Sequence, residues 1–82
     1  MVQTDMAKLD RITVEPGKMN GQPCIRGMRI TVKRVVLAVA TYGMGEEFKR
    51  AYPDLEDEDI RQALEYAALN LEDRVEELVA AR

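Results

Sequence analysis

Residues 21–32 read GQPCIRGMRITV, and the other predicted elements are placed relative to this stretch. Its centre, Gly27-Met28, separates two short extended pieces, Cys24-Ile25-Arg26 and Arg29-Ile30-Thr31, which predicts a tight hairpin or a sharp bend. From Val32 onward the apolar residues recur at helical spacing, and Thr31 is the expected N-cap. The stretch therefore predicts both a chain reversal and the start of the first helix.

The residues on the N-terminal side predict an arm and a strand. Residues 1–10 are expected to form a polar N-terminal arm. Residues 11–15 alternate polar and β-branched side chains, which is typical of a short strand, and Pro16-Gly17 ends it.

The residues on the C-terminal side predict three helices. The first is expected over residues 32–42 with Gly43 as its stop, and the second over residues 46–52, where Pro53 forbids continuation. The third begins near Asp57, with acidic residues in its first turn. Asn70 resembles a new cap, so residues 71–81 either form a separate helix or continue the third one.

These elements predict a mainly α fold of three parts. Residues 1–10 form the arm, residues 11–69 a short β-hairpin followed by a three-helix bundle, and residues 70–82 a C-terminal helical extension. A short helix, a tight turn and a longer helix have the spacing of a helix-turn-helix, although any compact three-helix domain has similar lengths.

Size and composition favour a small domain with little stability to spare. The chain has 82 residues, of which 46% are hydrophobic, and its aromatic side chains are few. Association of two copies would stabilise such a chain, so a homodimer is expected. Its interface is expected to bury Leu37 or Ala38 together with Ile25 or Ile30, because the first helix is apolar on two sides.

Composition also excludes several classes of protein. The chain has no His and one Cys, Cys24, which removes a disulfide framework, the usual zinc sites and the Ser/His and Cys/His catalytic pairs. The longest apolar run, residues 35–40, is too short to span a bilayer, and the first residues lack the apolar core of a signal peptide. We therefore expect a cytoplasmic protein with no membrane segment, cofactor or metal.

An enzyme is the least favoured class. Asp57 and Glu58 could in principle act as acid and base or hold a metal. Both fall in the first turn of a predicted helix, where capping explains them, and no nucleophile or imidazole accompanies them.

Charge is distributed unevenly along the chain. Residues 1–34 carry seven basic and three acidic side chains, a net of +4, whereas residues 35–82 carry five basic and twelve acidic ones, a net of -7. Such polarity could orient the protein on a nucleic acid, match a basic protein partner or pair two subunits head to tail. It could equally give two solvated faces with no partner.

Two sets of residues are candidates for binding. For duplex DNA, phosphate contacts are expected from the basic residues near the hairpin and base contacts from the third helix. These DNA-binding candidates are Arg26, Arg29, Lys33, Arg34, Arg61 and Gln62. Against this, the acidic run at residues 56–59 would meet a phosphate-lined groove, and the basic residues would be solvated if DNA is not bound.

For a protein partner, the apolar edge of the C-terminal tail is the candidate, unless it packs on its own subunit. Its residues are Leu71, Val75, Leu78 and Val79.

Several motifs together resemble one family. They are the stretch at residues 21–32, Tyr42-Gly43-Met44, Glu46-Glu47, Tyr52-Pro53-Asp54-Leu55 and the helix that contains residues 59–64. Over about Ile12 to Ala68 the chain resembles the domain-of-unknown-function family numbered 433, whose usual pattern is G-x-P-x-I-R-G-T-R-I-P-V. It departs from that pattern at Met28, where Thr is usual, and at Thr31, where Pro is usual.

The resemblance implies a fold and a function. It implies a homeodomain-like domain of three helices with an N-terminal β-hairpin, often dimeric and likened to the antitoxin half of VapB-type toxin–antitoxin pairs. The implied task is to bind and neutralise a PIN-like nuclease toxin and to bind operator DNA as an autoregulator. The acidic C-terminal half suits the first role and the basic hairpin the second. The alternative is a stand-alone helix-turn-helix transcriptional regulator.

Overall fold

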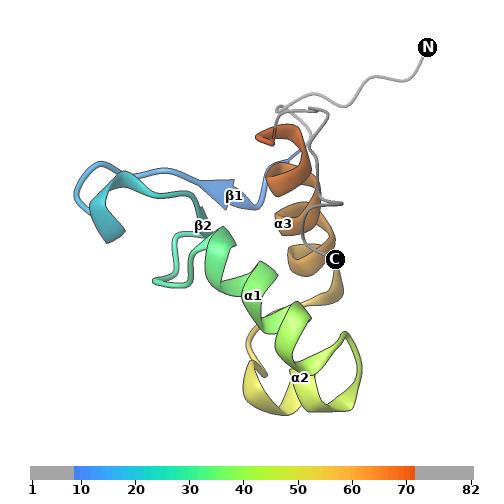
Figure 1. The fold of residues 1–82 in the computed structure, drawn as a ribbon. Coiled ribbons are helices and arrows are strands. Elements are labelled where there is room, and N and C mark those ends of the chain that lie inside the picture. Colours follow the sequence, from blue (N-terminus) through green and yellow to red (C-terminus); the bar gives the residue numbers. More distant parts are fainter. Residues whose placement is uncertain (1–8, 72–82) are drawn as a thin grey trace, which may run out of the picture.

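The structure, a computed structural model, describes residues 9–71. Within this range the fold is mainly helical, with three helices and a short two-stranded antiparallel sheet on their N-terminal side (Figure 1). The expected division at residues 10 and 70 falls at the two edges of the described range, and most of the predicted arm and tail lie outside it. None of the helices within residues 9–71 has the length and apolar character needed to cross a membrane.

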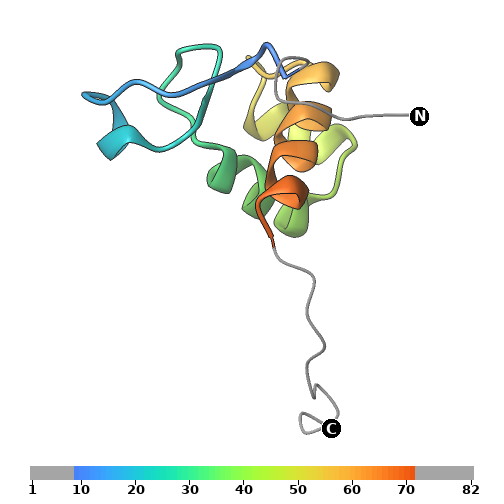
Figure 2. The same cartoon turned by 90° about the horizontal axis from the view of Figure 1, so that it is seen from above.

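The sheet joins two segments that flank a long loop. Strand β1, Ile12–Thr13, pairs antiparallel with strand β2, Cys24–Ile25, so that Ile12 faces Ile25 and Thr13 faces Cys24. Between them, the loop and the short 3₁₀ helix η2, Met19–Gly21, project away from the helices in both views (Figures 1 and 2). The expected strand at residues 11–15 is confirmed in a shortened form.

The sharp bend predicted at Gly27 is confirmed. Ile25 and Met28 close the turn through a hydrogen bond of 2.7 Å from the Met28 N–H to the Ile25 carbonyl. Arg26 and Gly27 between them both have positive φ, 45° and 71°, as in a type I′ turn. The chain then returns alongside β2, because the Ile25 N–H donates to the Ile30 carbonyl at 3.0 Å.

Helix α1, Val32–Tyr42, has the predicted bounds. The Thr31 hydroxyl accepts a hydrogen bond from the Arg34 N–H at 3.0 Å, which confirms Thr31 as the N-cap. Gly43 stops the helix with a φ of 79°, and its N–H donates to the Val39 carbonyl.

The two following helices also lie close to their predicted positions. Helix α2, Glu46–Ala51, ends one residue before the expected Tyr52, which is its C-cap. Helix α3, Asp57–Leu69, begins with a capping box in which the Glu56 side chain and the Asp59 side chain each accept from the other's backbone N–H. Asn70 caps the C-terminus of α3, and its side-chain amide donates to the Tyr66 carbonyl at 2.9 Å.

One core holds the helices and the sheet together. It lies mainly between α1 and α3, with Phe48 of α2 closing one end and Ile25 of β2 the other. The core residues are Ile25, Val32, Val35, Ala38, Phe48, Leu55, Ile60 and Ala63. Full burial of a side chain such as Val35 contributes about 1.5 to 3 kcal/mol to stability.

Candidate binding surfaces

Arg26 turns back from the hairpin onto the start of α3. Its Nε donates to Asp59 Oδ1 at 2.9 Å, its Nη2 donates to Asp59 Oδ2 at 2.8 Å, and the same Nη2 reaches the Asp54 carbonyl at 3.0 Å. A second arginine, Arg11, places Nη1 3.1 Å from Asp59 Oδ1 and 2.7 Å from Glu56 Oε1. The Asp59 side chain is 0% exposed. These contacts form the Asp59 cluster, which joins the residue before β1, the turn after β2 and the start of α3.

The pKa of Asp59 follows from this setting. Burial alone would raise its pKa, but the hydrogen bonds from Arg26, from the Glu56 backbone and from Arg11 outweigh burial and hold the pKa below its ordinary value of 3.8. The hydrogen bonds to Glu56 and Asp59 raise the pKa of Arg11, and the hydrogen bonds to Asp59 raise that of Arg26. Asp59 therefore stays charged and serves as an anchor within the fold.

Two other DNA-binding candidates on α3 also have partners within the chain. Arg61 forms ion pairs of 2.7 Å with Glu58 and with Glu65, and its hydrogen bonds help to lower the pKa of Glu58 to about 2. Gln62 is buried, accepts a hydrogen bond from the Arg11 N–H and donates to Asp10. In this arrangement Arg26, Arg61 and Gln62 are engaged within the chain, and each of the two arginines is more exposed than the carboxylates that it pairs with.

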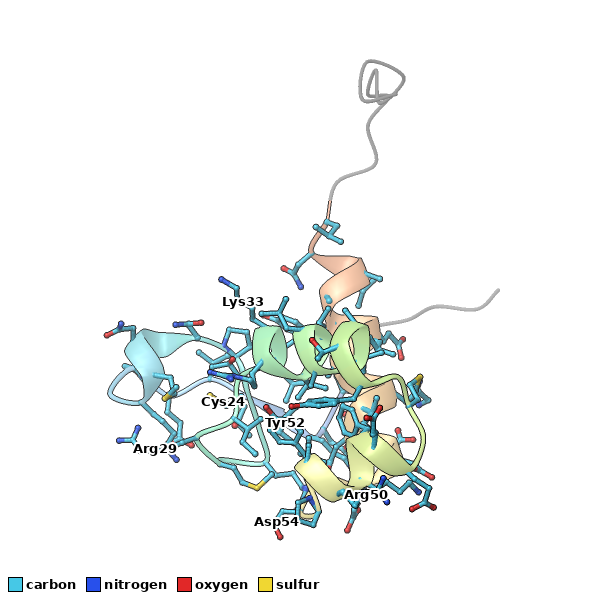
Figure 3. The ribbon with its side chains drawn as sticks, turned by 60° about the horizontal axis from the view of Figure 1, so that its bottom comes forward. Cys24, Arg29, Lys33, Arg50, Tyr52 and Asp54 are labelled. Atoms are coloured by element: carbon cyan, nitrogen blue, oxygen red, sulfur yellow. The ribbon has the colours of Figure 1, made fainter. Side chains whose placement is uncertain are left out.

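The remaining candidates, Arg29, Lys33 and Arg34, are exposed. None of the ion pairs formed within residues 9–71 involves them. Figure 3 shows that Arg29 and Lys33 project on different sides of the start of α1. Arg29 and Lys33 therefore lie on two surfaces, and Arg34 shares a recess with each of them.

The first surface is a recess between the hairpin and α1, which we call the polar recess. It has a volume of about 280 Å³. Its lining consists of Met19, Arg29, Ile30, Thr31, Arg34 and Tyr52. Arg29 and Arg34 thus line one recess, and none of the described residues in its wall carries a carboxylate. Sequence reasoning did not connect Met19 or Tyr52 with the two arginines, because these residues come from three separate segments.

The second surface is an apolar groove between α1 and the end of α3, with a volume of about 350 Å³. We call it the apolar groove. Its apolar lining consists of Pro23, Val32, Val36, Leu37, Tyr66, Ala67 and Leu71, and its polar lining of Gln22, Lys33 and Asn70. Leu37 is 53% exposed and Leu71 is 76% exposed, so the groove carries large apolar side chains that the described residues do not cover.

Of the four partner-binding candidates, only one lies within the described residues. Leu71 belongs to the apolar groove, whereas Val75, Leu78 and Val79 lie outside the described residues. Among the residues proposed for a dimer interface, Leu37 is exposed and Ile30 half-buried, but Ala38 and Ile25 are 4% and 0% exposed within one chain. Leu37 and Ile30 are therefore the two that a second copy can reach.

No group of three or more potential metal ligands occurs within residues 9–71. Asp57 and Glu58, the acids considered for catalysis, lie in the first turn of α3. Asp57 approaches Lys49 at 3.5 Å, and Glu58 binds Arg61 and Gln62.

Comparison with known proteins connects this fold to one family. Residues 12–67 match the family described as "Protein of unknown function (DUF433)". A crystal structure of a DUF433 member protein from Anabaena variabilis is similar to this chain, with 34% sequence identity and a TM-score of 0.61. That match covers 73% of this chain and 59% of the other, so this chain spans less than two thirds of the relative's length. No curated protein matches the chain.

Proposed function

Because this chain belongs to the DUF433 family, whose function is unknown, we propose a function from its own surfaces: it is an antitoxin-like protein that binds and neutralises a PIN-like nuclease. The apolar groove is the observation that carries this proposal. It offers a continuous apolar surface between two helices, which suits an apolar helix or loop of a partner. The family that the sequence resembles is likened to antitoxins, and this likeness supplies the identity of the partner. We propose that the chain catalyses no reaction and acts in the cytoplasm.

Charge supports a nuclease as the partner. Asp54, Glu56 and Asp57 are exposed near the start of α3, and a nuclease presents a surface that attracts phosphates or metal ions. Carboxylates can occupy such a surface in place of the substrate. The groove would then supply affinity, while the acidic residues would supply orientation.

The test is inhibition of the nuclease encoded by the neighbouring reading frame. Leu37→Glu places a charge in the apolar groove without touching the core, since Leu37 is 53% exposed, and should weaken inhibition at least tenfold. Met44→Glu is the matched control, because Met44 is 55% exposed and does not line the groove. Equal inhibition by both variants would contradict the role of the groove.

Truncation after Asn70 tests the tail separately. The core cluster ends at Ala67, so the truncated chain should still fold. If Leu71, Val75, Leu78 and Val79 contact the nuclease, the truncated chain should lose inhibition. Inhibition that survives truncation and fails in Leu37→Glu would assign the contact to the helices alone.

DNA binding is the second candidate function, favoured by Arg29, Lys33 and Arg34. We propose that α2 and α3, with residues 52–56 between them, form a homeodomain-like helix-turn-helix. The acidic start of α3 repels phosphates, so we place the phosphate contacts at the hairpin and the start of α1. Gel shifts with the chain's own upstream region at low salt should show binding, and the absence of any shift would remove this function.

A homodimer forms part of the proposal. Leu37 and Ile30 are the side chains available for an interface, and a chain of 9.3 kDa gains stability from association. Light scattering at micromolar concentration should give twice the chain mass. A monomeric mass, together with a melting temperature independent of concentration, would contradict the dimer.

A further inference from the structure

The polar recess brings together two arginines from different elements. Arg29 lies on the segment that returns alongside β2 after the turn at Arg26-Gly27, and Arg34 lies in the first turn of α1. The described contact of the Arg29 guanidinium is a weak one, from Nη1 to the sulfur of Met19 at 3.6 Å. Two like charges that share a recess repel each other, and an anion between them would remove that cost.

Three other arginines of the chain have partners within it. Arg11 and Arg26 bind Asp59, and Arg61 binds Glu58 and Glu65. Each of these guanidinium groups has a carboxylate from the same chain within 3.1 Å. Arg29, Arg34 and Arg50 take part in none of the ion pairs within residues 9–71, and of these three only Arg29 and Arg34 line the polar recess.

The start of α1 adds to the attraction. Thr31, its N-cap, lines the recess, so the positive end of the helix dipole borders the same space as the two guanidinium groups. Thr31 and Tyr52, which also line the recess, each carry a hydroxyl group that can donate a hydrogen bond. An oxyanion with several acceptor oxygens fits this set of donors better than a single carboxylate would.

We infer that the polar recess is a phosphate-binding site, in which Arg29 and Arg34 hold one backbone phosphate of duplex DNA. Guanidinium groups bind phosphate oxygens in pairs, and two of them on one phosphate fix the orientation of the protein on the duplex. This inference rests on the DNA-binding candidate function and locates its strongest phosphate contact. Lys33 does not line the polar recess, although it shares a neighbouring recess with Thr31 and Arg34.

The experiment measures affinity for a duplex from the upstream region between 50 and 200 mM NaCl by fluorescence anisotropy. The variants are Arg29→Ala, Arg34→Ala and the double variant. Arg50→Ala is the matched control, because Arg50 is an exposed arginine of α2 that does not line the recess and lies well away from Arg29 (Figure 3). All single variants lose the same charge, so a difference between them reports position.

The expected result depends on the number of phosphates held. Each contacted phosphate contributes about 0.9 to the slope of log affinity against log salt. If both arginines hold one phosphate, the double variant should lower the slope by about 0.9 relative to the full chain, and not by about twice that amount. A double variant with the affinity and slope of Arg50→Ala would overturn the inference while leaving DNA binding intact.

A second measurement covers the case in which the full chain binds no duplex. Inorganic phosphate is titrated into the ¹⁵N-labelled full chain and followed by NMR. Shifts at residues 29–34 that disappear in the double variant would show that the recess takes free phosphate, so that the DNA-binding function fails but the site stands. If the chain binds neither duplex nor phosphate there, the inference is wrong.

Discussion

Arg26 holds both carboxylate oxygens of Asp59, with its Nε 2.9 Å from Oδ1 and its Nη2 2.8 Å from Oδ2. Arg26 has a φ of 45°, which is unfavourable for a residue with a side chain, and the ion pair offsets that cost. The same carboxylate caps α3 by accepting from the Glu56 N–H at 2.8 Å. One buried side chain thus positions the turn and the start of the last helix together.

Asp59→Asn should destabilise the fold strongly. The amide cannot pair with two arginines, and loss of one member of a buried ion pair should cost about 3 kcal/mol, the low end of the usual range, because both arginines keep some contact with water. Urea unfolding measures the difference. Asp57→Asn is the control in the same helical turn: its side chain is 84% exposed, so its pair with Lys49 contributes little and the variant should unfold like the wild type.

Arg26→Ala should be coupled to Asp59→Asn. When Asp59 is present, Arg26→Ala removes one of its two arginine partners. In the Asp59→Asn background the carboxylate that Arg26 pairs with is already gone. A double-mutant cycle in urea should therefore show a smaller effect of Arg26→Ala in the second background. Additive effects would mean that the two side chains stabilise the fold independently.

Acid should destabilise the fold through two carboxyl groups. The pKa of Asp59 lies below its ordinary 3.8, and that of Glu58 falls from 4.5 to about 2. As pH falls, both carboxyl groups bind protons at a higher pH in the unfolded chain than in the folded chain, and this favours unfolding. The stability that the two groups contribute is therefore fully present above about pH 4.5 and declines as pH falls toward about 2. Unfolding free energy measured at several pH values should follow this curve, and Asp59→Asn should flatten it. A wild-type stability that is constant from pH 5 to pH 2.5 would contradict the assignment.

Local signals in the sequence predicted most of the fold. Thr31 and Gly43 marked both ends of α1, and Pro53 stopped the chain just after α2, because caps and breakers act on their immediate neighbours. The pairing of β1 with β2 was not predicted, since Ile12 and Ile25 are brought together only by the long loop between them.

The Asp59 cluster was not predicted either, because its residues are far apart in the sequence. Asp59 was interpreted as one of several first-turn acids, and its partners Arg26 and Arg11 lie 33 and 48 residues away in sequence. The available signal was the spacing of Glu56 and Asp59, which fits a capping box and sets Asp59 apart from Asp57 and Glu58. Gln62, one turn later on the same side of α3, was taken for a base-reading residue and is buried instead.

Cys24 should be unreactive while the chain is folded. It is 2% exposed, lies in β2 opposite Thr13, and its thiol donates to the Gln22 carbonyl at 3.4 Å. A thiol reagent should label it only as fast as the hairpin opens, and quickly in urea. Immediate labelling of the native protein would mean that the hairpin is open in solution. Cys24→Ser should leave any binding activity unchanged.

Gly27→Ala should test the turn that aims Arg26 at Asp59. Gly27 has a φ of 71°, and a methyl group there would lie 3.6 Å from a Glu15 carboxylate oxygen, so the cost comes from the backbone and not from a clash. We expect a loss of about 1 to 2 kcal/mol in unfolding free energy. Gly17→Ala is the matched control, because a methyl group there would meet no atom within 4 Å and no positive φ is required. It should leave stability unchanged or slightly raised, since alanine restricts the unfolded chain. If the two variants unfold at the same urea concentration, the positive φ at Gly27 is not needed, and the contact between Arg26 and Asp59 must be reached through a different turn.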